Sequence, residues 1–356
     1  MGNCVQLAGS TNGDAVTRAK AADQRRWRML GVDQRGRGYP RKKPRIIADR
    51  ARSADIRGSV RGNLRPIMLT CMGIVLTRIV MRATLHAQHV RLRKCVLEER
   101  VIRSGLVSVT FRALAPQAIV DLCARAGVAG IEWGGDVHVP HGDLAQARRV
   151  RQMTEDAGLT VASYGSYYRV GWGEPCPFET VLETAQALGA PMIRVWAGKK
   201  GSVDANADER DLVVRDSLRC ADLAAQEGIG LAYEWHVGTL TDTNESARWL
   251  LDRVAGASIK SYWQPPLHTT PAYNLAGLDI VQRCLGNVHV YQWHMDSAER
   301  MPLLAGESVW MPYLAKIAAI PGDRFAMLEF VKDDEPDNFV KDSATLKEWL
   351  ARVAER

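Results

Sequence analysis

The sequence lacks the signatures of several large classes of protein. Its seven cysteines are widely spaced and include no C-x-x-C pair, which argues against a disulfide framework or a zinc–thiolate site and suits a reducing cytoplasm. The most apolar run, residues 67–81, is interrupted by Arg78 and falls short of the ~20 residues that cross a bilayer. Neither G-x-G-x-x-G nor G-x-x-x-x-G-K-[ST] occurs, so no Gly-rich phosphate loop is present. We therefore expect a cytoplasmic protein without a membrane segment.

Positive charge is concentrated at the start of the chain. Residues 1–103 hold 23 of the 47 Lys and Arg residues but only seven of the 40 Asp and Glu residues, a net charge of +16 against −9 for the remainder. Apolar periodicity is poor there, so we expect residues 1–103 to be a largely disordered basic extension. A nucleic-acid arm would carry interleaved aromatic residues, whereas Trp27 and Tyr39 stand alone. We favour an extension with no function of its own.

From residue 104 to residue 356 the sequence alternates short β-rich runs with longer helical patterns. Segments such as "ARAGVAGIEW" and "AQEGIGLAYEW" share one pattern, in which a helix ends at Gly and an apolar strand follows a tight turn. Eight such units in ~250 residues predict a (β/α)8 TIM barrel. The expected strands are residues 106–111, 130–133, 160–164, 192–196, 230–234, 258–263, 287–293 and 324–330.

The candidate site residues follow from this fold, because the chemistry of such barrels lies at the C-terminal ends of the strands. Five of the six histidines in the barrel part follow a strand end, and the sixth, His289, lies within a strand and is expected to be a core residue. The polar and aromatic candidates at strand ends are Glu132, His138, Trp196, Glu234, His236, Gln264, His268, His294, Arg300 and Glu329.

Two of these candidates indicate a metal. Glu234 and Glu329 each end an otherwise apolar run, "GLAYE" and "FAMLE". A lone carboxylate in such a place is destabilising unless a cation or hydrogen-bond donors accompany it. Two carboxylates beside imidazoles favour a hard divalent ion, Mn²⁺, Mg²⁺ or Co²⁺.

With these residues the part from 104 to 356 resembles the xylose-isomerase-like barrel superfamily, which includes sugar isomerases, ketose 3-epimerases and endonuclease-IV-type proteins. The resemblance implies one metal held by Glu, Asp, His and Glu on strands five to eight. Glu234, His294 and Glu329 match three of these positions, and Gln264 replaces the Asp. Gln offers a carbonyl oxygen but removes one negative charge, which weakens the expected metal site.

The resemblance also implies a function. A metal-dependent sugar isomerase or epimerase would form an enediolate from a ketose or aldose, with Glu234 and Glu329 as the base and acid. Its substrate, a small sugar, would contact a set of side chains at the strand ends. The expected substrate-binding residues are Glu132, His138, Trp196, His236, His268 and Arg300.

Three alternatives remain open at this point. A metal-dependent dehydratase of a keto-sugar or cyclitol acid would use the same chemistry, and Gln264 leaves room for a metal-free sugar-binding barrel. A DNA-repair endonuclease is disfavoured because the three-zinc ligand set is missing and the barrel part is acidic, which repels phosphate. Nucleic acid and membrane are therefore not expected partners, whereas a homo-oligomer is compatible with the sequence.

Overall fold

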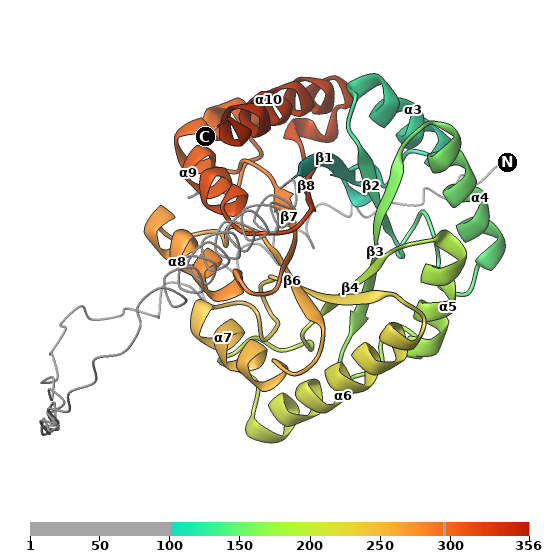
Figure 1. Ribbon diagram of the computed structural model, residues 1–356, viewed down its shortest axis with the longest axis vertical. Coiled ribbons are helices and arrows are strands. Elements are labelled where there is room, and N and C mark those ends of the chain that lie inside the picture. The colour runs from blue at the N-terminus through green and yellow to red at the C-terminus, as the bar shows by residue number, and fades with distance from the viewer. Residues whose placement is uncertain (1–100, 295–296, 356) are drawn as a thin grey trace, which may run out of the picture. The chain divides into compact units, whose positions relative to one another are not determined.

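The structure is a computed structural model that describes residues 101–294 and 297–355. Eight parallel strands close into a barrel in chain order, and helices lie outside it between successive strands (Figure 1). The prediction of a (β/α)8 barrel is confirmed. The expected disordered extension, residues 1–103, lies almost entirely outside the described residues, so its domain boundary stays a prediction. None of the described helices is long and apolar enough to cross a membrane.

The elements follow one another in strict alternation. The strands are β1 (Ile102–Val107), β2 (Gly130–Gly134), β3 (Thr160–Arg169), β4 (Met192–Trp196), β5 (Gly230–Glu234), β6 (Ile259–Trp263), β7 (Leu285–Val290) and β8 (Arg324–Leu328). The helices are α3 (Pro116–Ala126), α4 (Leu144–Asp156), α5 (Phe178–Leu188), α6 (Ala207–Gln226), α7 (Asn244–Arg253), α8 (Pro271–Val281), α9 (Glu307–Ala318) and α10 (Pro336–Ala354), with short 3-10 turns at Ser108–Phe111, Leu303–Gly306 and Lys332–Asp334.

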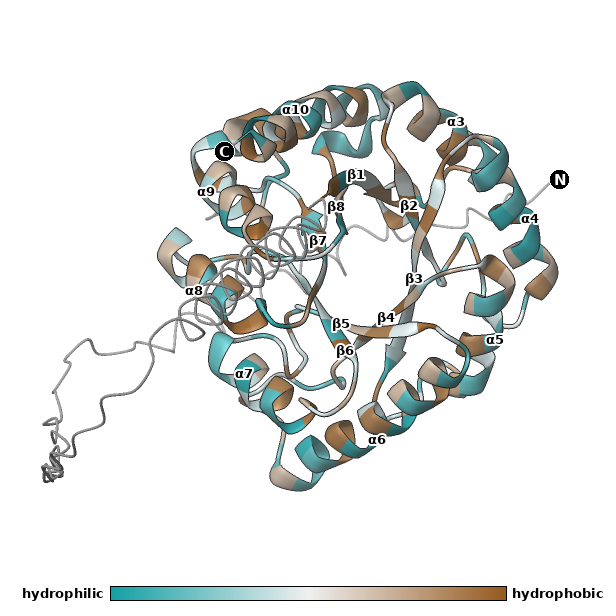
Figure 2. Cartoon of the chain, viewed as in Figure 1, coloured by the Kyte–Doolittle hydropathy of each residue, from teal (hydrophilic) through white to brown (hydrophobic). Residues whose placement is uncertain are grey.

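Local sequence explains where these helices begin and end. Helix α3 starts with Pro116, which needs no backbone N–H there, and ends at Gly127 with a φ of 65°, a left-handed conformation suited to glycine. Helix α6 begins with a capping box, in which the Asn206 side chain and the Glu209 side chain each bond the other's backbone N–H. The helices carry both hydrophobic and hydrophilic residues (Figure 2), as amphipathic helices on a buried parallel sheet must.

Three strands differ most from the sequence-based expectation, namely β1, β3 and β7, and the difference in β7 bears on a candidate site residue. Strand β3 continues to Arg169 instead of ending at residue 164. The first strand ends at Val107, and Ser108–Phe111 form a 3-10 turn, where the Ser108 hydroxyl accepts a hydrogen bond from Gly134 N. The seventh strand ends at Val290 rather than residue 293. Beyond it the chain reverses, and Trp293 pairs antiparallel with Arg300.

Candidate active site

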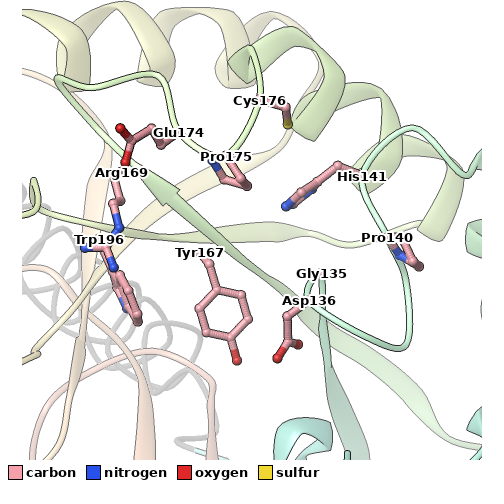
Figure 3. Close-up of a pocket in the computed structure, with 10 residues that line it drawn as sticks. All are labelled: Gly135, Asp136, Pro140, His141, Tyr167, Arg169, Glu174, Pro175, Cys176 and Trp196. Atoms are coloured by element: carbon pink, nitrogen blue, oxygen red, sulfur yellow. The ribbon is translucent and has the colours of Figure 1, made fainter. Parts of the chain in front are cut away.

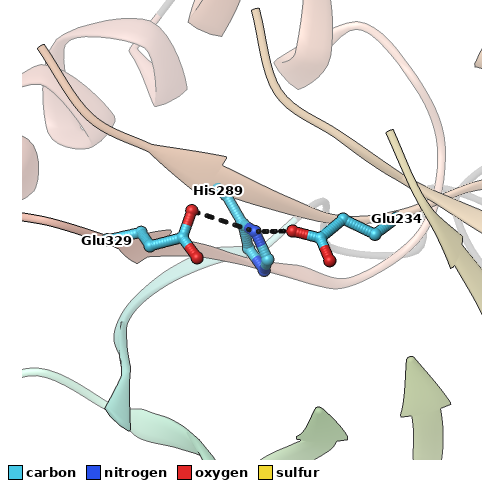
Figure 4. Close-up of side chains that lie close together, drawn as sticks. All are labelled: Glu234, His289 and Glu329. Atoms are coloured by element: carbon cyan, nitrogen blue, oxygen red, sulfur yellow. Dashed lines mark ion pairs between the residues drawn. The ribbon is translucent and has the colours of Figure 1, made fainter. Parts of the chain in front are cut away.

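Two carboxylates and one imidazole meet near the C-terminal ends of strands β5, β7 and β8. His289 of β7 lies between Glu234 of β5 and Glu329, which follows β8 (Figure 4). Its Nδ1 is 3.5 Å from Glu234 Oε1 and 3.5 Å from Glu329 Oε2. All three side chains are buried, and their ligand atoms lie within 4.8 Å of one another. No other group of this kind occurs among the residues that the structure describes.

The donor set fits a divalent ion. Two ligands of one ion at ~2.1 Å lie roughly 3–3.5 Å apart, close to the observed separations. Both ring nitrogens of His289 are buried, and neither has a hydrogen-bond partner within the described parts of the chain. Gln264 has a neutral amide oxygen that is available as a ligand. Its Nε2 donates a hydrogen bond to Trp235 O at 2.7 Å, while its buried Oε1 has no hydrogen-bond partner in the described chain. The Glu–His–Glu group therefore fits a metal ion, and the role of Gln264 as a further ligand stays a prediction from the sequence.

Arg194 of β4 orients one of these carboxylates. Its Nε donates to Glu132 Oε1 at 2.6 Å, and its Nη1 donates to Glu234 Oε2. The Trp196 indole N–H donates to the same Glu234 oxygen. The two oxygens of Glu234 thus have different surroundings: Oε2 is held by Arg194 and Trp196, and Oε1 faces His289.

A glycine makes room for this guanidinium. A Cβ at Gly165 of β3 would lie 2.7 Å from Arg194 Nη2 and 2.9 Å from Glu132 Oε1, closer than side chains are packed. The close approach of the strand backbone to the ion pair explains why glycine occupies this position in an otherwise side-chain-bearing strand.

The charges of this network shift one another's pKa values. Burial alone would raise the pKa of Glu132, but Arg194 and His289, with a hydrogen bond from Ser163, lower it to about 2. Burial alone would lower the pKa of His289, but Glu329 and Glu132 raise it to about 9. Without a metal ion, His289 is therefore a cation at neutral pH, and three carboxylates face one guanidinium and one imidazolium.

A pocket of about 740 Å³ opens in front of this network. Figure 3 shows His141 on one side of it and Arg169 with Trp196 on the other. Tyr167 and Trp196 connect the pocket to the buried charges, because the Arg194 guanidinium lies 5.0 Å from the centre of the Tyr167 ring and Trp196 bonds Glu234. Tyr167 has a φ of 56°, an uncommon conformation for a large residue that is typical of functional sites.

His236, which follows β5, lies beside the pocket wall. Its ring is stacked on Trp196 with centroids 4.6 Å apart, and its Nδ1 is 2.7 Å from Val237 O. A carbonyl only accepts, so Nδ1 carries the proton and Nε2 keeps a lone pair. Burial lowers the pKa of His236, which favours this neutral form.

The structure brings together five of the ten residues singled out from sequence, namely Glu132, Trp196, Glu234, His236 and Glu329, with Gln264 buried at the end of neighbouring β6. The other four lie elsewhere. His294 is exposed at the start of the chain reversal that follows β7, and His268 is exposed in the loop after β6. Arg300 pairs with Asp334, and His138 is buried against the Ser108 hydroxyl.

The imidazole in the cluster is thus His289 and not His294, because β7 stops three residues earlier than expected. His289 is fully buried, as expected of a core residue, but it also lies among three carboxylates, with Nε2 3.6 Å from Glu132 Oε1 and Nδ1 3.5 Å from oxygens of Glu234 and Glu329. Arg194 was missed as well. A signal was available, since an Arg within the apolar run "MIRVW" needs a buried acid as surely as the two glutamates need a cation.

Comparisons with known proteins agree with this barrel. The profile of the xylose isomerase-like TIM barrel family matches residues 120–351. The chain belongs to this family. Among curated proteins, a 3-dehydroshikimate dehydratase of Bacillus anthracis is 26% identical over 170 residues, which cover 45% of this chain and 60% of that protein. The match thus spans less than two thirds of the relative's length.

Solved structures share the fold of this family member at low sequence identity. The crystal structure of the probable 3-DHS dehydratase from Bacillus anthracis superposes with a TM-score of 0.60 and 21% identity, covering 69% of this chain and 99% of that one. A D-allulose 3-epimerase from Methylomonas sp. gives a TM-score of 0.52 and 17% identity, covering 70% and 99%. The family therefore includes both dehydratase and epimerase activities, and the fold alone does not choose between them.

Proposed function

We propose that this family member is an enzyme that moves a proton at the carbon next to a carbonyl group of a small sugar, as a metal-dependent isomerase or epimerase. The observation that supports it is the convergence of Glu234, His289 and Glu329 at the C-terminal strand ends, beside a pocket large enough for a sugar. A divalent ion held by these three residues and Gln264 would supply Lewis-acid chemistry at the carbonyl oxygen.

Side chains of the protein itself would orient the reacting groups and transfer the proton. Arg194 and Trp196 hold Glu234 in one orientation, so its Oε1 is presented at a fixed place. The side chain of Glu329 faces only His289 among its described ionic partners, and this leaves it freer to accept and return a proton. Glu329 and Glu234 are thus the proposed proton-transfer pair on opposite sides of the reacting carbon.

A dehydratase is the second candidate, and the similarity to the 3-dehydroshikimate dehydratase favours it. Elimination of water begins with the same proton abstraction but then needs an acid for the departing hydroxyl group. His236 is proposed for this role, since its ring lies on Trp196 at the pocket and an imidazole can give and take up protons.

One experiment separates the two reactions. Purified protein with Mn²⁺ is incubated in D₂O with D-fructose, D-allulose, D-xylose and 3-dehydroshikimate, and the products are analysed by mass spectrometry and NMR. An isomerase or epimerase gives an isomer carrying solvent deuterium, and a dehydratase gives a product lighter by one water. If no compound exchanges a carbon-bound proton and none loses water, a metal-free binding barrel is the better description.

A further inference from the structure

The pocket in front of the buried charges has one cation without a partner. Its charged lining residues are Asp136, Arg169 and Glu174. Arg112 pairs with Asp136 at 2.7 Å, and Lys199 pairs with Glu174 at 2.8 Å. The Arg169 guanidinium has no hydrogen bond or ion pair with any residue of the described chain; its side-chain contact is with the Trp196 ring, 4.2 Å away. Arg169 is therefore the one charged residue of this lining that has no ion pair within the described chain.

Arg169 is also held in place. Its backbone N–H donates to Glu174 O at 2.8 Å, and the residue pairs with Trp196 across β3 and β4. Because both its backbone and its stacking partner are fixed, the guanidinium is presented to the pocket at little entropic cost. Partial burial lowers the pKa of Arg169, and the nearby Glu174 carboxylate offsets this only in part.

Trp196 sets the distance between this cation and the proposed reaction centre. Arg169 lies over the indole ring, and the indole N–H bonds Glu234. A ligand whose charged group meets Arg169 therefore has its other end one indole ring away, near the buried carboxylates. This arrangement suits a small molecule with an anion at one end and the reacting carbon at the other.

We propose that Arg169 binds a carboxylate of the substrate, so that the enzyme acts on a polyhydroxy acid rather than on a neutral sugar. This inference rests on the proposed function for the identity of the site. A guanidinium fork matches a carboxylate through two parallel hydrogen bonds. A phosphate ester brings a charge of about −1.5 to −2, which one guanidinium flanked by Asp136 and Glu174 does not balance.

Binding is measured with matched ligands that differ only in charge. The probes are D-glucuronate and D-galacturonate, their uncharged methyl esters, and D-glucose 6-phosphate, and dissociation constants come from titrations of the melting temperature. For the wild-type protein we expect at least one of the two acids to bind ~10-fold or more tighter than its ester, as a charge-assisted bidentate contact provides.

Two variants of equal charge change separate a binding role from a structural one. Arg169→Gln should bring the acid-to-ester ratio to about one while ester affinity stays unchanged. Arg149→Gln, an exposed change on α4, should keep the wild-type ratio. Equal binding of acid and ester by wild type, failure of both acids to bind, tighter binding of the phosphate, or an unaltered ratio in Arg169→Gln would each overturn the proposal.

The same ligands keep this inference distinct from the proposed function. If the acid preference depends on Arg169 but no carbon-bound proton exchanges in D₂O, the pocket assignment stands and the proposed reaction fails. If proton exchange proceeds equally well with acid and ester, the reaction stands and the carboxylate site is wrong.

Discussion

Arg194 is surrounded by opposite charge on the interior side of the barrel. It is 1% exposed and bonds both Glu132 and Glu234, so each carboxylate depends on it for charge compensation. Breaking a buried pair leaves the partner charge unpaired in a medium that solvates it poorly, which is more damaging than the loss of a surface ion pair.

We therefore expect Arg194→Met to destabilise the protein by about 3 kcal/mol or more. The measurement is the free energy of unfolding by denaturant. Arg149→Met on the exposed face of α4 serves as control and should change this quantity by no more than about 0.5 kcal/mol. Similar stability of the two variants would mean that Arg194 does not support the network.

The identity of the imidazole in the cluster can be tested directly. Mn²⁺, Mg²⁺ or Co²⁺ should raise the melting temperature of the wild-type protein, because an ion that binds only the folded state stabilises it by mass action. His289→Gln should abolish most of this rise, whereas His294→Gln should retain it, since within the described part of the chain it is His289 that lies between the two carboxylates. Gln264→Asp should tighten metal binding by adding a negative charge. The opposite result for the two histidines would restore the ligand set expected from sequence.

His289 also predicts a pH dependence of the metal-free protein. Its folded-state pKa is raised from 6.5 to about 9, so its stabilising contribution is complete below pH 6.5 and is lost as the pH rises toward 9. In EDTA, the melting temperature should fall across this interval. His289→Gln should lack this component of the fall. A wild-type profile no steeper than that of the variant would show that the imidazolium is not stabilised by its neighbours.

Glu329 carries the prediction that bears most directly on chemistry. Glu329→Gln keeps an oxygen donor but removes the base, so turnover should fall by ~10²–10⁴ while the melting temperature with metal changes little. Deuterium exchange into the substrate measures turnover. A structural role predicts the reverse, with altered stability and activity per folded molecule within a few-fold of wild type.

At the scale of elements, the strand ends decide which side chains meet. The ends of β5 and β8 lie within two residues of the ends predicted from sequence, because an apolar run ending in Glu marks the point where a strand leaves the core. β7 was placed three residues too far, since "HVYQWH" continues the β-rich pattern although the chain already reverses there. Such a reversal depends on the pairing of Trp293 with Arg300, which local sequence does not reveal.

The contribution of strand β1 to the stability of the closed barrel can be tested with shortened chains. Its residues Ile102–Leu106 pair with Arg324–Leu328 of β8, so it completes the sheet. A chain beginning at Val101 should unfold cooperatively at a melting temperature close to that of the full chain. A chain beginning at Ser108 lacks β1 and should not unfold cooperatively, as circular dichroism during heating would show. Equal melting of the two shortened chains would mean that closure adds nothing to stability.

At the scale of the whole molecule, the alternation of strands and helices was sufficient to predict the barrel, because four helices end at or next to Gly and the strands are mostly apolar. The site was predicted only in part. The glutamates interrupt apolar runs at their ends and are conspicuous, whereas Arg194 and His289 lie within strands whose register around the barrel is set by contacts far apart in sequence. Three tryptophans at strand ends, Trp133, Trp235 and Trp263, are buried in the core.

The pairing of β1 with β8 has a consequence for how this barrel folds during synthesis. The Thr110 hydroxyl accepts a hydrogen bond from Phe330 N, 220 residues away along the chain, so the two ends of the barrel can join only after nearly all of it has been synthesised. Until then β1 and β7 are open edges, which invite association with other unfinished chains. Glu329 follows the strand that closes the ring, and the proposed site is therefore among the last features to form. A shortened chain that ends before β8 lacks both the closure and this carboxylate, so catalytic activity would report the number of fully closed barrels in a preparation.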